Sequence, residues 1–135
     1  MTDVRMIEVA HPYRGPNGAL DVIGQDGLPF PVARAFRIAG VPPGAWRGNH
    51  AHRTCRQILW SVSGSWRATI EAGPGQERIV DLHEGADGIY VPSMHWLRVA
   101  SCARLGVLVV LCSEPYDEAS YIRERSVWER ERGRA

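Results

Sequence analysis

The sequence predicts an all-β fold, an antiparallel sandwich or barrel followed by one short helix at the C-terminal end. Fourteen glycines and nine prolines divide the 135 residues into short segments. Between these breaks, apolar residues recur mostly at every second position, which is typical of strands with one buried face. Only residues 117–132 carry a helical pattern. A chain of this length is expected to form a single domain over residues 1–135.

The predicted strands follow one another at short, regular intervals, as they do in antiparallel sandwiches and barrels. Residues 63–65, Ser-Gly-Ser, predict a tight hairpin turn. The longest apolar run, residues 105–112, is far shorter than the roughly 20 residues that span a bilayer, so it predicts a buried strand. In the tail, Tyr121, Val127 and Trp128 form the apolar stripe of the expected helix. The predicted strands cover residues 4–10, 19–23, 34–38, 57–63, 66–72, 77–82, 88–91, 96–100 and 105–112.

The composition excludes several classes of function. Sixteen basic and 15 acidic residues give a net charge of +1, whereas proteins that bind nucleic acids or membrane surfaces usually carry a basic excess. All 16 basic residues are arginines, which excludes catalysis through a lysine Schiff base. Cys55, Cys102 and Cys112 show no paired spacing, which favours reduced thiols and a cytoplasmic protein. Asp3 and Glu8 argue against a signal peptide in the first ten residues.

The residues best suited to chemistry lie in the segment WRGNHAH, residues 46–52. If this segment is extended, His50 and His52 point to the same face, because side chains alternate along a strand. Two imidazoles on one face form either half of a metal site or a pair of proton-transfer groups. Two histidines with a purely structural role are the third interpretation.

The spacing around the histidine pair resembles a known motif. Gly44, His50, His52, Gln57 and Gly64 follow the first cupin motif, Gly-x5-His-x-His-x(3,4)-Glu-x6-Gly, with Gln57 in place of the glutamate. This resemblance implies a jelly roll. The predicted fold is therefore a cupin antiparallel jelly-roll β-barrel with a short C-terminal helix.

The second cupin motif is only partly present. Pro92 matches it, but Met94 replaces its glycine and Leu97 replaces its metal-binding histidine. The cupin resemblance implies three imidazoles and a carboxylate for tight metal binding, and neither Gln57 nor Leu97 supplies such a ligand. His95 shares the face of Leu97 if both lie on one strand, so it is the remaining candidate for a third ligand. We expect a site without a metal, in which the histidines transfer protons.

Residues 47–52, RGNHAH, are similar to the Arg-Gly-x-His-Ala-His signature of the nucleotide-sugar 3,4-ketoisomerases, small WxcM-like cupins. The tail motif YDE-x-x-YIR, residues 116–123, extends this resemblance. It implies conversion of a dTDP-4-keto-6-deoxyhexose to its 3-keto isomer through an enediolate, in deoxysugar biosynthesis and without a cofactor. Phe36 and Arg37 stand where the family often has two tyrosines, which bears on the identity of the sugar. Further matches are Arg14-Gly15, Leu20, Pro29-Phe30, Arg34, Gln57, Val62-x-Gly64, residues 88–92 and Trp96.

We expect His50 and His52 to be catalytic, with His52 as the base and His50 as the proton shuttle. An imidazole with a pKa near 6.5 accepts and returns protons at neutral pH. Guanidinium groups match phosphate oxygens, so arginines near the histidines are candidate ligands of a diphosphate. Aromatic and polar side chains near the same strand are candidates for contacts with the base and the sugar. The expected substrate-binding residues are Arg47, Arg37, Arg14, Gln57, Tyr90, Trp96 and His95.

Three other functions remain open. A metal-free cupin epimerase would exchange a proton at C3 or C5 of the same class of sugar. A metal-dependent cupin enzyme would use His50, His52 and His95 as ligands, and a sugar-binding cupin would have no activity. The expected partners are a nucleotide-linked keto sugar and a second copy of the chain, with no nucleic acid and no membrane. The homodimer would use the edge strand at residues 4–10.

Overall fold

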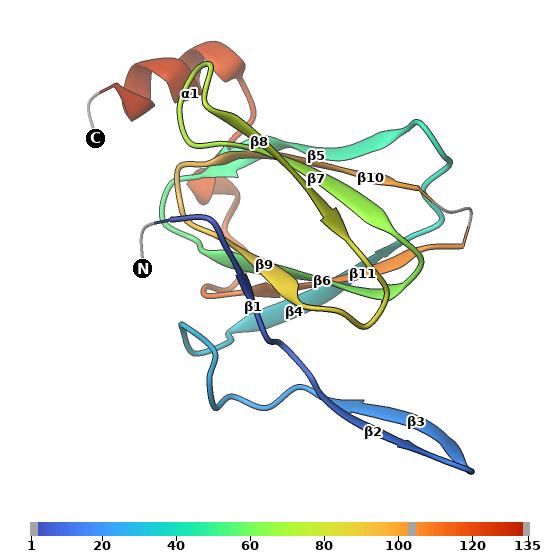
Figure 1. Cartoon of the computed structure of the whole chain (residues 1–135). Coiled ribbons are helices and arrows are strands. Elements are labelled where there is room, and N and C mark those ends of the chain that lie inside the picture. The colour runs from blue at the N-terminus through green and yellow to red at the C-terminus, as the bar shows by residue number, and fades with distance from the viewer. Residues whose placement is uncertain (1–2, 103–104, 134–135) are drawn as a thin grey trace.

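The computed structural model describes residues 3–102 and 105–133. Two five-stranded antiparallel sheets lie face to face (Figure 1), which confirms the all-β prediction and its cupin-like sandwich. The first sheet has the order β1 (Arg5–Ile7), β9 (Gly88–Val91), β6 (Gln57–Ser63), β11 (Val107–Cys112) and β4 (Arg34–Ala39). The second has the order β12 (Tyr121–Ile122), β5 (Trp46–His52), β10 (Trp96–Ser101), β7 (Trp66–Glu71) and β8 (Glu77–Leu82).

The helix predicted over residues 117–132 is wrong in its first half. The structure has a 3₁₀ turn, η1 (Glu118–Ser120), then strand β12, and only then the helix α1 (Arg125–Arg132). Tertiary contacts override the weak helical pattern, because β12 pairs with β5 and the Arg53 guanidinium donates to the carbonyls of Ala119 and Tyr121 at 2.7 and 3.2 Å. Within the described residues, no helix is long and apolar enough to cross a membrane.

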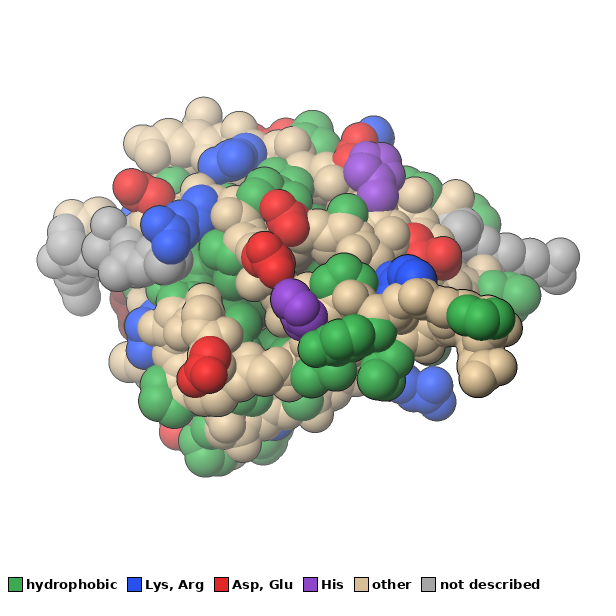
Figure 2. Space-filling model, turned by 60° about the horizontal axis from the view of Figure 1, so that its bottom comes forward, with side chains coloured by type: hydrophobic (Ala, Val, Ile, Leu, Met, Phe, Trp, Pro, Cys, Tyr) green, Lys and Arg blue, Asp and Glu red, His purple; other side chains and the backbone are tan. Residues whose placement is uncertain are grey.

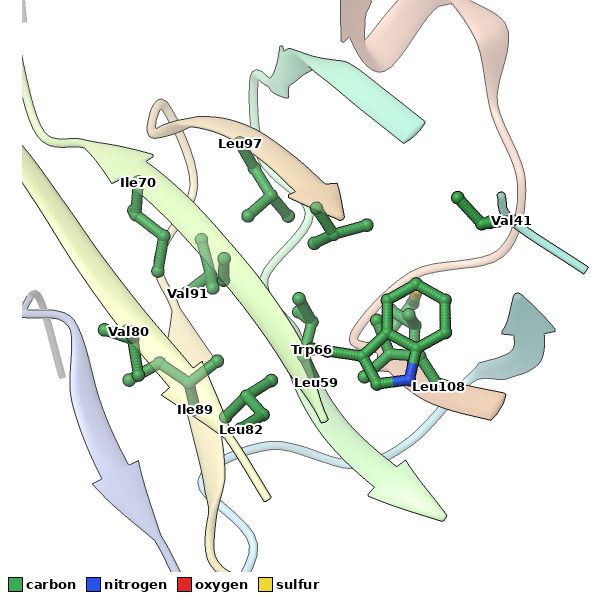
Figure 3. Close-up of a cluster of buried hydrophobic side chains, with 14 of the residues drawn as sticks. Val41, Leu59, Trp66, Ile70, Val80, Leu82, Ile89, Val91, Leu97 and Leu108 are labelled. Carbon is green, nitrogen blue, oxygen red and sulfur yellow. The ribbon is translucent and has the colours of Figure 1, made fainter. Parts of the chain in front are cut away.

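The main hydrophobic core fills the space between the two sheets (Figure 3). Large side chains from both sheets meet there, among them Leu59, Trp66, Ile70, Ile89 and Leu108. Two smaller clusters cover the outer faces of the sandwich. One packs the N-terminal segment on the first sheet, and the other packs Trp128 of α1 on Ala51, Trp96 and Ile122 of the second.

A hairpin projects from the sandwich at the N-terminal side (Figure 1). The strand predicted over residues 4–10 is shorter in the structure, since β1 ends at Ile7. A separate strand that the sequence analysis did not predict, β2 (His11–Gly15), then pairs with β3 (Gly18–Val22). Every residue of the hairpin is exposed, including the apolar side chains of Leu20 and Val22. Figure 2, which brings this end of the molecule forward, shows hydrophobic side chains at the surface.

Strand β5 contains an extra residue that sets which side chains face the interior of the sandwich. Leu97 of β10 pairs with His50, but the next residue of β10 pairs with Gly48, so Asn49 is the extra residue of a bulge. Gly48 and Asn49 have φ angles of 90° and 63°, in the left-handed region. The Trp96 indole Nε1 donates to Asn49 Oδ1 at 3.0 Å and fixes the bulge from outside.

We predict that Gly48→Ala destabilises the protein more than Gly44→Ala. Both glycines have a φ near 90°, but a Cβ at Gly48 would lie 3.1 Å from the Leu97 carbonyl oxygen, whereas Gly44 has no atom within 4 Å. The backbone strain common to both costs about 1–3 kcal/mol, and the close contact adds to it only at Gly48. Urea unfolding of the two variants measures the difference, and equal midpoints would contradict the close approach.

Candidate active site

A cavity of about 430 Å³ opens between the two sheets. Its base is apolar and consists of Leu59, Leu97, Val99 and Val110, which also belong to the main core. The remaining wall combines the apolar Phe36, Ile38 and Ala39 of β4 with polar and cationic side chains from β4, β5, β6 and the segment after β11. These polar lining residues are Arg37, Arg47, His50, Gln57, Tyr121 and Arg123.

The bulge in β5 explains how Arg47 and His50 reach the same cavity. The two residues are three positions apart, so a regular strand would direct them to opposite faces. The extra residue at Asn49 restores the same face for both. Beyond the bulge the strand alternates regularly, so Ala51 packs in the outer cluster while the rings of His50 and His52 lie 5.0 Å apart.

Tyr121 packs against both histidines. Its ring centroid lies 5.0 Å from that of His50 and 4.3 Å from that of His52, its partner in the β12–β5 pairing. His50 is half-buried and lines the cavity, whereas His52 is only 5% exposed and is not among the lining residues. His50 is therefore the imidazole that a ligand in the cavity meets first.

Both imidazoles have a pKa below the ordinary value of 6.5 that the sequence analysis assumed. Burial lowers the pKa of His52 to about 3, with further lowering by His50, Arg34 and Arg123. Burial also lowers the pKa of His50, and Arg123 adds to this, while the Gly48 backbone and Glu118 act in the opposite direction. Both rings are therefore neutral at pH 7. In the described part of the chain, His50 Nδ1 and both ring nitrogens of His52 are buried without a hydrogen-bond partner.

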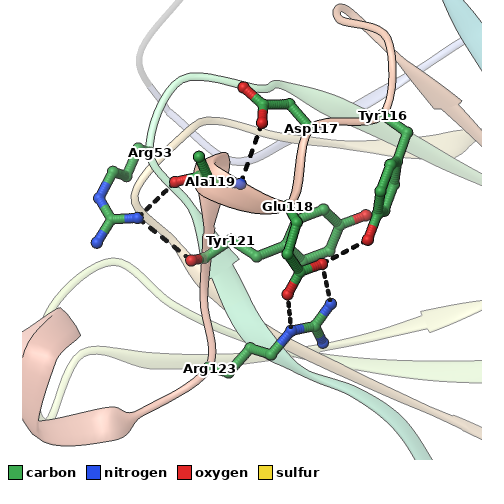
Figure 4. Close-up of polar contacts among 7 residues, drawn as sticks. All are labelled: Arg53, Tyr116, Asp117, Glu118, Ala119, Tyr121 and Arg123. Atoms are coloured by element: carbon green, nitrogen blue, oxygen red, sulfur yellow. Dashed lines mark hydrogen bonds and ion pairs between the residues drawn. The ribbon is translucent and has the colours of Figure 1, made fainter.

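The segment after β11 is fixed to the body of the protein by polar contacts (Figure 4). The Arg123 guanidinium donates to Glu118 from Nε and Nη2 at 2.8 and 3.0 Å, and it lies 4.5 Å over the Tyr121 ring. The Tyr116 hydroxyl also donates to Glu118. Asp117 Oδ1 accepts from the Ala119 amide and begins the 3₁₀ turn. These contacts present Tyr121 and Arg123 to the cavity.

Tyr121 and Arg123 were not among the site residues predicted from the sequence. Their motif was identified, but the tail was expected to be helical, and nothing in a helix pattern placed it beside the histidines. The pairing of β12 with β5 could only be found from the fold.

The structure places Arg37, Arg47 and Gln57 among the residues that line the cavity with His50. Arg37 pairs with Val109, which packs in the outer cluster, so Arg37 reaches the cavity from the edge of its sheet. Four other predicted substrate-binding residues lie away from the cavity. Tyr90 pairs with Ile58, so it lies on the outer face of its sheet, where it packs on Phe30 with ring centroids 6.3 Å apart. Trp96 directly precedes Leu97 and therefore points outward, to Trp128.

Arg14 and His95 also lie elsewhere. Arg14 is on the projecting hairpin, where it forms an ion pair with Asp21 at 2.8 Å. His95 precedes β10, in a turn where Met94 has a φ of 60°, so strand alternation does not carry His95 to the face of Leu97. Its Nδ1 lies 2.9 Å from the Ser93 carbonyl oxygen.

The fold does not bring together His50, His52 and His95, the ligands of the alternative metal site. Across residues 3–102 and 105–133, no group of three or more His, Cys, Asp or Glu side chains is arranged to hold a metal ion. The first-motif position of the cupin carboxylate is filled by Gln57, whose Nε2 donates to Cys112 Sγ at 3.5 Å. The cavity is thus lined by one imidazole, that of His50, and the carboxamide of Gln57, with the His52 imidazole buried behind them.

Comparison with known proteins agrees with this architecture. The chain is 33% identical over 97 residues to TDP-4-oxo-6-deoxy-alpha-D-glucose-3,4-oxoisomerase of Aneurinibacillus thermoaerophilus, a match that covers 72% of this chain and 69% of the relative. The sugar 3,4-ketoisomerase of Thermoanaerobacterium thermosaccharolyticum in complex with TDP superimposes with a TM-score of 0.89 at 30% identity, covering 97% of this chain and 95% of that one.

The same ketoisomerase has also been solved with one histidine replaced by asparagine, in complex with TDP-4-keto-6-deoxyglucose. It superimposes on this chain with a TM-score of 0.90 at 28% identity, covering 99% of this chain and 96% of that one. Residues 2–133 match the FdtA family, described as WxcM-like, C-terminal. With nearly the whole chain inside this match and a relative 33% identical, the protein belongs to the FdtA, WxcM-like C-terminal family.

Proposed function

We propose that this protein is a nucleotide-sugar 3,4-ketoisomerase, which converts a dTDP-4-keto-6-deoxyhexose to its 3-keto isomer. The observation that carries the proposal is the neutral imidazole of His50 on the wall of a cavity that also presents three arginines. Relatives of the same family named as 3,4-oxoisomerases and 3,4-ketoisomerases support the choice of reaction.

The cationic wall suits the diphosphate of such a substrate. Arg123 is paired with Glu118, whereas within the described residues Arg37 and Arg47 have no carboxylate partner within 4.0 Å. Guanidinium groups with free donors bind phosphate oxygens through paired, charge-assisted hydrogen bonds. The cavity volume is within the usual range for small-molecule sites, and its apolar base leaves room for the deoxysugar ring.

The chemistry requires a base that is neutral before the reaction. The C4 carbonyl acidifies the C3 hydrogen, and the free imidazole nitrogen of His50 takes that proton, leaving an enediolate across C3 and C4. A proton is then delivered to C4, and the O3 hydroxyl gives up its proton as O4 gains one, so that the carbonyl moves to C3. The atoms balance and the sugar is neither oxidised nor reduced overall.

His52 is the second proton-transfer group in this proposal. Its ring lies 5.0 Å behind that of His50 and both of its nitrogens lack partners among the described residues. Because burial keeps both imidazoles neutral, a proton that either ring accepts is readily returned. The negative charge on the enediolate is stabilised by the cationic wall, to which Arg123 contributes beside the Tyr121 ring. This order of the two histidines reverses the one expected from the sequence, because only His50 lines the cavity.

Incubation with dTDP-4-keto-6-deoxyglucose in D₂O tests the function directly. We expect NMR to show a 3-keto product that carries solvent deuterium at C4, because the proton delivered there comes from a group that exchanges with water. Deuterium at C3 or C5 with the carbonyl still at C4 would instead indicate an epimerase. Binding without turnover would indicate a sugar-binding protein, and activity lost on chelation would indicate a metal-dependent enzyme.

The two histidines are distinguished by the variants His50→Asn and His52→Asn. We expect His50→Asn to lose C3 proton exchange by about 10²-fold or more, since asparagine cannot accept a proton at neutral pH. His52→Asn should keep measurable C3 exchange while net isomerisation falls. NMR of C3 exchange and product formation in the same samples measures both, with circular dichroism as the control for folding. Loss of C3 exchange only in His52→Asn would return the role of base to His52.

We also propose that the protein is a homodimer in which the projecting hairpin contacts the second copy. The hairpin exposes Leu20 at 60%, and among the described residues its two strands pair only with each other. Exposed apolar strands of this kind favour association. Arg14 lies on the same hairpin and would reach a diphosphate only in the cavity of the partner.

Sedimentation velocity at micromolar concentration should give about twice the 15.0 kDa chain mass. The variant Leu20→Arg should shift the protein to the monomer, because it places a charge on the proposed contact. The matched control is Ile79→Arg, which changes an equally exposed apolar residue, at 57%, on β8 of the sandwich and should leave the dimer intact. A monomeric full-length protein, or a dimer unaffected by Leu20→Arg, would contradict the contact.

A further inference from the structure

Arg34 stands behind the histidine site, where neither the sequence motifs nor the proposed chemistry gives it a role. It begins β4 and pairs with Cys112 of β11, in the sheet opposite to the one that carries the histidines. Its Nη2 donates a hydrogen bond to Cys112 Sγ at 3.5 Å, and interaction with the Tyr121 side chain raises the pKa of the guanidinium. It also lies 5.5 Å from the ring centroids of Phe36 and Tyr116. Arg34 therefore links the first sheet to Tyr121 on the second.

Tyr121 connects Arg34 to the imidazoles. Its ring contacts His50 and His52 with centroids 5.0 and 4.3 Å away, inclined by 56° and 60°. Figure 4 shows Tyr121 beside the Glu118–Arg123 ion pair, with its carbonyl oxygen bonded by Arg53. The buried histidine nitrogens have no hydrogen-bond partner in the described residues to fix their rings. The Tyr121 ring packs on both imidazoles, and the Gly48 backbone acts in addition on His50.

We propose that Arg34 and Tyr121 form a positioning pair, in which the Arg34 guanidinium fixes the Tyr121 hydroxyl and the Tyr121 ring holds both imidazoles in place for proton transfer. This inference rests on the proposed function of the cavity. Neither residue exchanges a proton with the substrate in this account. Their effect passes through His50 and His52, where a displacement of about 1 Å can cost roughly a hundredfold in rate.

Arg34 also acts on the histidines through its charge. It is one of the cations that keep the pKa of His52 low, after burial and His50. Removing a cation favours the protonated imidazole, so loss of the Arg34 charge raises the pKa of His52. Charge and geometry can therefore be separated by substitution. The charged or titratable groups around the two imidazoles are Arg34 and Arg37 of β4, Arg47 of β5, Glu118 and Arg123 of the C-terminal segment, and the Tyr116 and Tyr121 hydroxyls.

A double-mutant cycle of Arg34→Gln and Tyr121→Phe tests the coupling. Each single variant is expected to lower kcat between about tenfold and a hundredfold with little change in KM, since the diphosphate-binding arginines are untouched. If Arg34 acts through the Tyr121 hydroxyl, the double variant should be no slower than the slower single variant. Effects that multiply in the double variant would show that the two residues act independently and would overturn the pair.

Imidazole titration by NMR on the substrate-free protein gives a readout that does not depend on turnover. Arg34→Gln should raise the pKa of His52, whereas Arg34→Lys keeps the charge and should leave the titration near that of the wild type while kcat still falls. Arg67→Gln is the matched control, because it removes an arginine from an exposed ion pair with Asp81 on another sheet edge. An unchanged His52 titration in Arg34→Gln would overturn the electrostatic half of the inference.

The kinetic cycle and the NMR measurements together distinguish failure of this inference from failure of the proposed function. A wild-type protein that does not isomerise the keto sugar defeats the function, yet the titration and the ring-current shifts of His50 and His52 in Tyr121→Phe and Arg34→Gln still decide whether the pair positions them. Unchanged ring-current shifts in both variants would contradict the pair. If Arg34→Gln does not fold, Tyr121→Phe removes a single oxygen and decides the same point.

Discussion

The bulge at Gly48 and Asn49 is the constraint on which the candidate site depends. Without the extra residue, Arg47 and His50 would face opposite sides of β5, and the cavity would lack one of the two. The bulge requires two consecutive left-handed residues, one of them closely approached by the Leu97 carbonyl, which explains glycine at the first position. Asparagine tolerates this conformation at the second and accepts the Trp96 hydrogen bond. Backbone geometry thus selects the composition of the site.

Burial of the histidines follows from the same arrangement. The bulge turns β5 so that His50 and His52 lie under Tyr121, away from bulk water, and cations on both sides oppose their protonation. Three ring nitrogens are left without partners among the described residues, which is costly in a folded protein. Such a cost is typical of sites whose polar groups are completed by a ligand or by water. Packing in the main core offsets this cost, since four residues that line the cavity belong to the same hydrophobic cluster as Trp66 and Ile70.

The sequence was sufficient for most strands of the sandwich and for the shared face of the histidine pair, because both depend on local alternation. It missed β12, which it predicted as helix, and gave β5 only as a possible extended segment. It was insufficient where a side chain's direction depends on contacts distant in sequence. Tyr90 is predicted to bind substrate, but its pairing with Ile58 places it on the outer face of its sheet. His95 was assigned a face by counting from Leu97, and the turn at Met94 invalidates that count. Tyr121 and Arg123 reach the site because β12 pairs with β5, and the residue pattern of the tail does not predict that pairing.

The cationic wall and the neutral imidazoles are linked electrostatically. Arg123 lowers the pKa of both histidines, and it lines the same cavity as Arg37 and Arg47, which have free charge to offer a diphosphate. A bound diphosphate places negative charge beside these arginines and offsets their field at the imidazoles. The pKa of His50 then moves back toward the value at which an imidazole both accepts and returns protons at neutral pH. In the proposed function, binding of the diphosphate would therefore make His50 a stronger base than it is in the ligand-free protein.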